Sequence, residues 1–223
     1  VDMIGVSMKS SLEAFPASKV HFTGNPCSEE ALKMAPAKKS EFGLHESKKL
    51  VYIVMGSLGS SIITDKLKTS IKLFENKNYE VMFVTGKGSY EDISKIEIPD
   101  NVKIFPYVES QARIMKKADL VVTRCGASTL AEIISLKLPS ILIPSPYVPN
   151  NHQYINGMDF VNKNAGVMIE EKDLTGPLLV ETIDKLIDDD KKLKEMRQNL
   201  ADLGIDDSAT KIYELLKKLI SKE

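Results

Sequence analysis

Short apolar runs alternate regularly with amphipathic segments from residue 50 onward, and this alternation constrains the fold more than any other feature of the sequence. The apolar runs cover residues 50–55, 80–85, 102–108, 119–123, 140–144 and 166–170. Between them lie segments with helical spacing of apolar residues, at about 62–76, 89–96, 110–117, 127–137, 150–163 and 173–187. Strands that alternate with helices predict a parallel sheet. Because most runs are apolar throughout, we expect helices on both faces, in a Rossmann-like α/β fold.

The two ends of the chain depart from this pattern. Residues 24–48 carry glycine, proline and many charges without clean periodicity, so we expect a linker with at most a short helix. Because residue 1 is valine rather than methionine, and residues 1–18 read as the tail of a domain, we expect a fragment of a longer protein. That expectation matters for function, because part of an active site would then lie outside the chain.

The C-terminal segment predicts two further helices. Residues 188–202 have apolar side chains at helical spacing, and capping residues after Gly204 begin a last helix. Five apolar residues form one stripe on that helix: Ile212, Leu215, Leu216, Leu219 and Ile220. We expect the stripe to pack into the core, and the alternative is a surface for a domain outside the chain.

The composition argues against several functional classes. The formal net charge of −1 gives no bulk attraction to nucleic acid or anionic lipid. No apolar run approaches the roughly 20 residues that a membrane span requires. Cys27 and Cys125 have neither CxxC spacing nor a neighbouring histidine cluster, so we expect no zinc site. Such sparse cysteine usage suits a reducing cytosol.

Ligands of open parallel sheets bind beyond the carboxyl ends of the strands, so the segments that follow the predicted strands are the candidate sites. Gly56-Ser57-Leu58-Gly59-Ser60-Ser61 follows the first strand. Glycines allow a tight turn, and amides at a helix start, with the hydroxyls of Ser57 and Ser60, suit a phosphate. An ordinary strand-to-helix turn is the alternative, because the segment matches neither the dinucleotide-binding fingerprint nor the P-loop.

A second candidate segment runs from Arg124 to Glu132. Small residues open the predicted helix, and Ser128 or Thr129 can donate a hydroxyl to a phosphate oxygen. Glu132 lies one turn further on. It is either a helix-dipole partner, worth about 0.3–1 kcal/mol, or an acceptor of ribose hydroxyls, each bond worth roughly 1.5–3 kcal/mol.

Two further segments offer neutral polar or aromatic groups. Asn151, His152 and Gln153 suit sugar hydroxyls better than phosphates, although His152 can simply be a polar residue at a helix start. No carboxylate partner for His152 is evident nearby in sequence, which argues against a catalytic base. Tyr107 and Val108 follow the third strand and either hold a flat base or pack at the sheet edge.

Together and in this order, these segments resemble the MurG-type UDP-N-acetylglucosamine transferases of glycosyltransferase family 28. The most specific stretches are RCGASTLAEI at 124–133 and LPSILIPSPYVPNNHQYING at 138–157. MGSLGS is similar to the family's GGSQGA but departs at Met55, Leu58 and Ser60. The resemblance extends from Thr23 to about Ile187. It implies the C-terminal half of a GT-B fold, with a donor-binding domain at 49–205.

The resemblance also implies the remaining boundaries and the site. Residues 1–23 would be the tail of a missing N-terminal domain, 24–48 the interdomain linker and 206–223 a C-terminal helix. Ser57 would touch the donor diphosphate, while Val108 would meet uracil with its backbone and Tyr107 would cap the ring. Glu132 would hold the ribose, and Gln153, with His152, would read the C3 and C4 hydroxyls of GlcNAc. The residues that would line the diphosphate and the sugar are Ala127, Ser128, Thr129, Leu130 and Ala131.

The activity implied by the resemblance is transfer of GlcNAc from UDP-GlcNAc to undecaprenyl-pyrophosphoryl-muramoyl-pentapeptide, converting lipid I to lipid II in peptidoglycan synthesis. The acceptor site, the base and the membrane-facing surface would lie in the missing domain. We therefore assign no catalytic residue, and expect donor binding without turnover from this chain alone. The resemblance implies no cofactor and no metal, and a full-length protein that is cytoplasmic and peripheral on the inner face of the bacterial membrane.

One departure bears on affinity. The family usually carries NPVR at the junction, whereas this chain has Asn25-Pro26-Cys27-Ser28 and lacks that positive charge. Donor affinity would then be lower, or Lys33 would substitute. Three other functions stay open: a glycolipid synthase that uses UDP-glucose or UDP-galactose on diacylglycerol, the soluble half of a split two-subunit transferase, and a flavodoxin-like or regulatory nucleotide-binding module.

Overall fold

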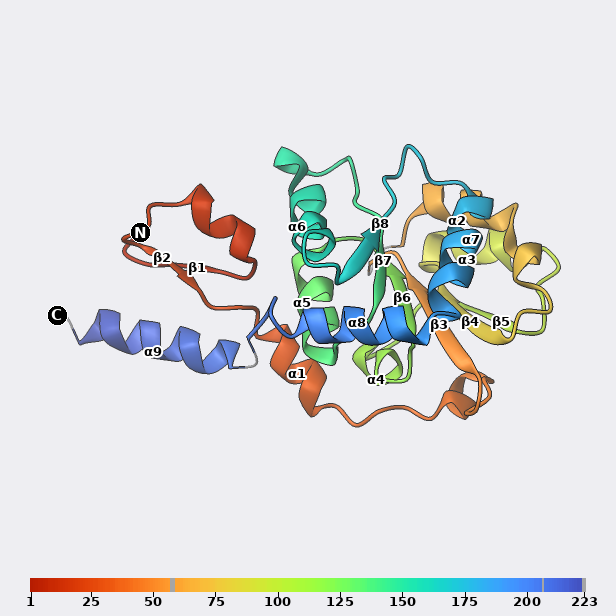
Figure 1. The fold of residues 1–223 in the computed structure, drawn as a ribbon, viewed down its shortest axis with the longest axis horizontal. Coiled ribbons are helices and arrows are strands. Elements are labelled where there is room, and N and C mark those ends of the chain that lie inside the picture. Colours follow the sequence, from red (N-terminus) through yellow and green to blue (C-terminus); the bar gives the residue numbers. More distant parts are fainter. Residues whose placement is uncertain (57–58, 206, 222–223) are drawn as a thin grey trace.

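A six-stranded parallel sheet forms the centre of the computed structural model, which describes residues 1–56, 59–205 and 207–221 (Figure 1). Its strands are β3 (Lys49–Val54), β4 (Tyr79–Val84), β5 (Val102–Phe105), β6 (Leu120–Thr123), β7 (Ser140–Leu142) and β8 (Gly166–Met168). They lie in the order β5-β4-β3-β6-β7-β8, and every neighbouring pair is parallel. The predicted Rossmann-like α/β class is confirmed.

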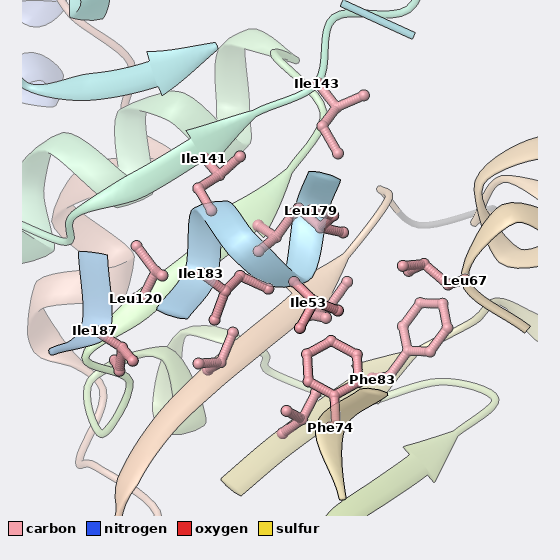
Figure 2. Close-up of a cluster of buried hydrophobic side chains, with 14 of the residues drawn as sticks. Ile53, Leu67, Phe74, Phe83, Leu120, Ile141, Ile143, Leu179, Ile183 and Ile187 are labelled. Atoms are coloured by element: carbon pink, nitrogen blue, oxygen red, sulfur yellow. The ribbon is translucent and has the colours of Figure 1, made fainter. Parts of the chain in front are cut away.

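Helices cover both faces of the sheet. They are α2 (Ser61–Lys68), α3 (Lys87–Ile93), α4 (Ala112–Met115), α5 (Ala127–Leu136), α6 (His152–Val161), α7 (Gly176–Ile187) and α8 (Asp190–Leu200), with short 3-10 turns at Ile71–Phe74 and Pro149–Asn151. Successive side chains of β3 alternate between two cores: Ile53 packs with α2 and α7, whereas Tyr52 packs with α5 and α6. Figure 2 shows the first core, where Leu179, Ile183 and Ile187 of α7 lie over the strand side chains. Continuous apolar strands therefore reflect burial on both faces.

The strand order fixes where a ligand fits. The chain builds outward from β3 through β4 to β5, and then returns to β6 on the other side of β3. The loops after β3 and β6 therefore diverge and leave a crevice between them, at the topological switch point of the sheet. The flavodoxin-like alternative does not fit, because that fold orders its strands 2-1-3-4-5.

The N-terminal segment is more ordered than the sequence suggested. β1 (Ile4–Val6) and β2 (Val20–Phe22) form a separate two-stranded parallel sheet, with a 3-10 turn at Lys9–Ala14 between them. The segment predicted as a linker, 24–48, contains α1 (Cys27–Lys33) and a 3-10 turn at Lys39–Phe42. Helix α1 packs against α5, which ties this segment to the main sheet.

The last helix, α9 (Ser208–Ile220), does not pack as expected. Its only buried residue is Ser208, while Leu216 and Ile220 are exposed. The helix extends away from the six-stranded sheet, on the same side as β1 and β2 (Figure 1). The helix starts beside the junction, where Ser208 is buried and a Cβ on Gly24 would lie 2.3 Å from Ser208 Oγ, and from there it runs away from the six-stranded sheet, so its stripe does not reach the core (Figure 1). The expectation that its apolar stripe joins the core is wrong.

Candidate functional site

A cleft of about 670 Å³ opens beyond the carboxyl ends of β3, β4, β6 and β7. Its described lining comes from residues 55–56 and 59–62 after β3, 88–89 after β4, 124, 126 and 129 after β6, and 145, 147 and 153 after β7. The cleft therefore occupies the switch point between β3 and β6. Its volume lies in the range of small-molecule sites, about 300–1,000 Å³.

The glycine-rich loop after β3 forms one wall of the cleft. Gly56 and Gly59 have φ values of 83° and 73°, which favour glycine. A Cβ on Gly59 would lie 2.2 Å from the carbonyl oxygen of Thr85, so only glycine lets this loop approach the end of β4. Ser60 caps α2 by accepting a bond from the Ile63 amide at 3.4 Å.

The start of α5 forms the opposite wall. Its N-cap is Gly126, which has no side chain to occupy the first amides. The first intrahelical bond runs from the Leu130 amide to the Gly126 carbonyl, at 3.0 Å. The helix itself therefore offers no acceptor to the amides of Ala127, Ser128 and Thr129. Together with the helix dipole, these amides suit an anion.

Arg124 lies between the two walls, with its side chain only 11% exposed. Its Nη1 donates to the carbonyls of Ile143 at 3.3 Å and Pro144 at 3.2 Å. Its Nη2 donates to Ser60 Oγ at 3.1 Å and forms an ion pair with the buried carboxylate of Glu171. One guanidinium thus joins the loops that follow β3, β7 and β8.

Gln153 at the start of α6 is held in a similar way. Its Oε1 accepts from the Cys125 amide at 3.2 Å and from the Ser145 amide at 2.9 Å. Asn156, also on α6, donates to the Cys125 carbonyl at 3.2 Å. Because two backbone donors fix the carbonyl end of Gln153, its Nε2 group is left to donate to a ligand in the cleft.

Glu132 is half-buried on α5, one turn beyond the cleft lining. Burial raises the pKa of this carboxyl above its ordinary value of 4.5. The hydrogen bond from Gln111 Nε2, at 3.2 Å, opposes that shift in pKa, and the nearby Glu30 carboxylate adds to it. An ionised Glu132 is therefore costly without a further donor.

Residues 50–215 match the glycosyltransferase family 28 C-terminal domain. The chain belongs to glycosyltransferase family 28. Over its whole length, this family 28 chain is 43% identical to a Bacillus cytotoxicus protein named UDP-N-acetylglucosamine--N-acetylmuramyl-(pentapeptide) pyrophosphoryl-undecaprenol N-acetylglucosamine transferase. The protein of the same name from Bacillus licheniformis is 36% identical over 98% of the chain. The chain spans 62% and 61% of the length of these two relatives.

Solved structures of low sequence identity share the fold. Acinetobacter baumannii MurG superposes with a TM-score of 0.77 at 19% identity, covering 98% of this chain and 61% of that one. A complex of S. aureus MnaA with UDP gives a TM-score of 0.78 at 14% identity, covering 99% and 61%. The family 28 chain therefore has the fold of the C-terminal half of a GT-B protein, as the resemblance predicted.

The structure places the predicted site residues of this family 28 chain at different depths. Thr129 and Gln153 line the cleft, Ser128 is exposed at the start of α5, and Ala127 is half-buried beside it. Leu130 and Ala131 are buried, and the Leu130 amide already bonds within the helix. Residues 127–129 of α5 can therefore contact a ligand in the cleft directly, whereas the side chain and amide of Leu130 cannot. Ser57 lies outside the described residues, so its contact stays a prediction.

Four other predicted residues lie outside the described cleft lining. Tyr107 is 53% exposed, with the Lys87 ammonium 5.9 Å from its ring centroid, and Val108 packs against the second core. His152 is exposed, and its Nδ1 lies 3.0 Å from the Pro149 carbonyl oxygen, a local contact at the start of α6. The Lys33 side chain is 80% exposed, and its ammonium pairs with the Glu29 carboxylate at 3.9 Å. Lys33 lines a separate hollow beside α1.

The sequence reasoning missed several lining residues. Arg124 opens the candidate segment after the fourth predicted strand but was given no role of its own, because its partners lie in loops that are distant in sequence. Gly88 and Ser89 follow the second strand, but the segment around them matched no known phosphate-binding motif. Among the described residues, no group of three or more His, Cys, Asp or Glu side chains is positioned to hold a metal ion.

Proposed function

We propose that the chain binds UDP-GlcNAc in this cleft and forms the donor-binding half of the transferase that adds GlcNAc to undecaprenyl-pyrophosphoryl-muramoyl-pentapeptide in peptidoglycan synthesis. The observation that carries the proposal is that one cleft combines groups that suit a diphosphate with a group that suits a sugar hydroxyl. Open amides at the start of α5 suit a diphosphate, and the fixed amide of Gln153 suits a sugar hydroxyl. Identity of 43% over the whole chain to a relative of that name supports it.

The proposed donor site assigns a role to each part of the nucleotide sugar. Glu132 accepts hydrogen bonds from the ribose hydroxyls, which offsets the cost of its buried charge. Tyr107 and Val108 hold the uracil beyond the edge of the cleft. Ser57 and residues 127–129 hold the diphosphate, and Gln153 reads the sugar, with His152 as its predicted helper. As the bond to the sugar breaks, the amides of α5 stabilise the charge that develops on the departing UDP.

The proposal includes the domain boundaries and the partners. Residues 1–23 would belong to a preceding domain, 24–48 to the linker, 49–205 to the donor-binding domain and 206–223 to the C-terminal helix. The separate sheet formed by β1 and β2 supports the first boundary. The preceding domain would bind the lipid-linked acceptor, supply the base and contact the inner face of the cell membrane. Across the described ranges, no helix combines the length and apolar character needed to cross a membrane.

Calorimetric titration of the chain without metal tests the proposal. UDP-GlcNAc is expected to bind more tightly than UDP or FMN, because Gln153 contacts a hydroxyl of the hexose that neither of these ligands carries. UDP-glucose carries the same C3 and C4 hydroxyls, so its affinity relative to UDP-GlcNAc tests which sugar the cleft prefers. The matched control is Lys185→Ala, which removes the charge of an exposed side chain on α7 outside the described cleft lining and is expected to leave all affinities unchanged. Tighter binding of UDP-glucose would instead favour a glycolipid synthase, and absence of any UDP binding would refute the proposal.

A further inference from the structure

Ser60 lies where the chain departs from the family's glycine-rich segment, and its hydroxyl lines the cleft. We infer that Ser60 donates a hydrogen bond to the donor diphosphate, and that Arg124 is the positioning residue that orients this hydroxyl. The inference rests on the proposed function, since it names a further residue of the same donor site.

Among the described residues, the recorded hydrogen bonds of the Ser60 side chain use its oxygen as an acceptor and leave its proton to donate elsewhere. A serine hydroxyl has two acceptor lone pairs and one donor proton. Its Oγ accepts from the Ile63 amide at 3.4 Å and from Arg124 Nη2 at 3.1 Å. Neither of these nitrogens can accept a proton in return. The hydroxyl proton therefore points away from both, and the exposed side of Ser60 is the cleft.

Arg124 itself has little capacity left for a ligand. A guanidinium carries five N–H donors, four of them on the two Nη atoms. Those Nη atoms contact the carbonyls of Ile143 and Pro144, the hydroxyl of Ser60 and the carboxylate of Glu171. Three of these contacts are hydrogen bonds and the fourth is an ion pair, so the protein already engages both Nη groups, and we expect Arg124 to act on the ligand mainly through Ser60.

A diphosphate is the ligand group that fits this hydroxyl. With both lone pairs of Ser60 used, the hydroxyl can only donate, and a sugar hydroxyl that needs an acceptor finds none. A phosphate oxygen only accepts, so the two are complementary. Because α2 begins at the next residue, the helix dipole also favours an anion beside this hydroxyl.

The test compares Ser60→Ala with Ser60→Thr, which keeps the hydroxyl and the helix cap. Calorimetry measures the affinity of the chain for UDP and for uridine, which lacks phosphate. Ser60→Ala is expected to bind UDP about tenfold more weakly, the loss of one hydrogen bond to a charged group, and to bind uridine unchanged. Ser60→Thr is expected to bind both like the wild type. Ser94→Ala, at an exposed serine on the end of α3, is the matched control.

The positioning role of Arg124 has its own readout. Arg124→Lys keeps the positive charge but loses the two planar Nη groups, one of which donates to Ser60 Oγ. It is therefore expected to weaken UDP binding in an otherwise wild-type chain and to add no further loss in the Ser60→Ala background. Equal losses in both backgrounds would show that Arg124 acts independently of Ser60. Equal losses of UDP and uridine in Ser60→Ala would reduce Ser60 to a structural cap. Undiminished UDP binding by Ser60→Ala overturns this inference alone, whereas a wild-type chain that binds no UDP overturns the proposed function as well.

Discussion

Glu171→Ala tests how much the buried ion pair between Arg124 and Glu171 contributes to stability. The substitution leaves the Arg124 guanidinium without its countercharge, in a place where the Arg124 and Glu171 side chains are 11% and 6% exposed. Removing one partner of a buried pair costs about 3–5 kcal/mol of the free energy of unfolding. Because Arg124 also lines an open cleft, where water reaches one side of it, we expect the lower end, about 3 kcal/mol.

The loss is measurable by heat and by denaturant. For a domain of this size, 1 kcal/mol shifts Tm by about 2–4 °C, so the variant is expected to unfold about 6–12 °C lower. Urea unfolding monitored by circular dichroism gives the free energy directly. The double variant Arg124→Met/Glu171→Leu is expected to recover most of that stability, because neither charge remains unpaired. It is not expected to recover UDP affinity, because Ser60 has lost the donor that orients it.

Glu181→Ala is the matched control. Glu181 pairs with Lys185 at 2.7 Å, but the two side chains are 61% and 73% exposed. Exposed pairs contribute about 0–1 kcal/mol. If Glu171→Ala costs no more than Glu181→Ala, then solvent screens the Arg124 pair, and the argument from its burial is refuted.

Four further predictions concern the proposed donor site. Glu132→Ala is expected to weaken the binding free energy of UDP by about 2–3 kcal/mol, because charge-assisted hydrogen bonds are lost, and calorimetry measures this change. Unchanged affinity would mean that Glu132 only interacts with the dipole of its helix. Because burial raises the pKa of Glu132 above 4.5, UDP affinity is expected to fall as pH drops through that raised pKa. The effect on stability has the opposite sign. At pH values near this raised pKa the folded state binds more protons than the unfolded state, so the free energy of unfolding falls as pH rises through the pKa. Glu132→Gln should remove the pH dependence of both UDP affinity and stability. Gln153→Ala is expected to weaken UDP-GlcNAc binding more than UDP binding, and equal losses would remove Gln153 from the sugar site. Gly59→Ala is expected to abolish UDP binding, because its Cβ would lie 2.2 Å from the Thr85 carbonyl oxygen; wild-type affinity would show that the glycine-rich loop relaxes without consequence.

Much of the fold was predictable because local pattern and global burial agree. Runs such as 50–55 and 80–85 are apolar on both faces, and this alone required a sheet covered by helices. The strand edges differ from the predicted ones by at most three residues, as at 102–108, where the strand ends at Phe105 and the proline that follows cannot donate to the ladder. The C-terminal helix was misjudged because an apolar stripe predicts a buried face without saying which part of a protein buries it.

The position of the cleft was predictable, but the side-chain contacts that shape it were less so. Segments after β3, β6 and β7 were named because ligands of parallel sheets bind beyond the carboxyl ends of the strands, and this rule needs only the positions of the strands along the chain. Arg124 and Ser145 were missed because their roles arise from contacts between loops that are distant in sequence. His152 and Gln153 are adjacent in sequence, yet only Gln153 lines the cleft, since successive residues at a helix start point in different directions.

The two backbone amides that donate to Gln153 Oε1 also affect the entropy of ligand binding. An unrestrained glutamine has several rotatable bonds, and freezing such a side chain on binding costs about 0.5–1.5 kcal/mol of entropy. Here the backbone of Cys125 and Ser145 has already frozen it during folding. A sugar that reaches Nε2 therefore meets a donor in its final orientation. Discrimination between sugars at this position then depends on the fit of a hydroxyl to a fixed group, and not on the side chain's readiness to adapt.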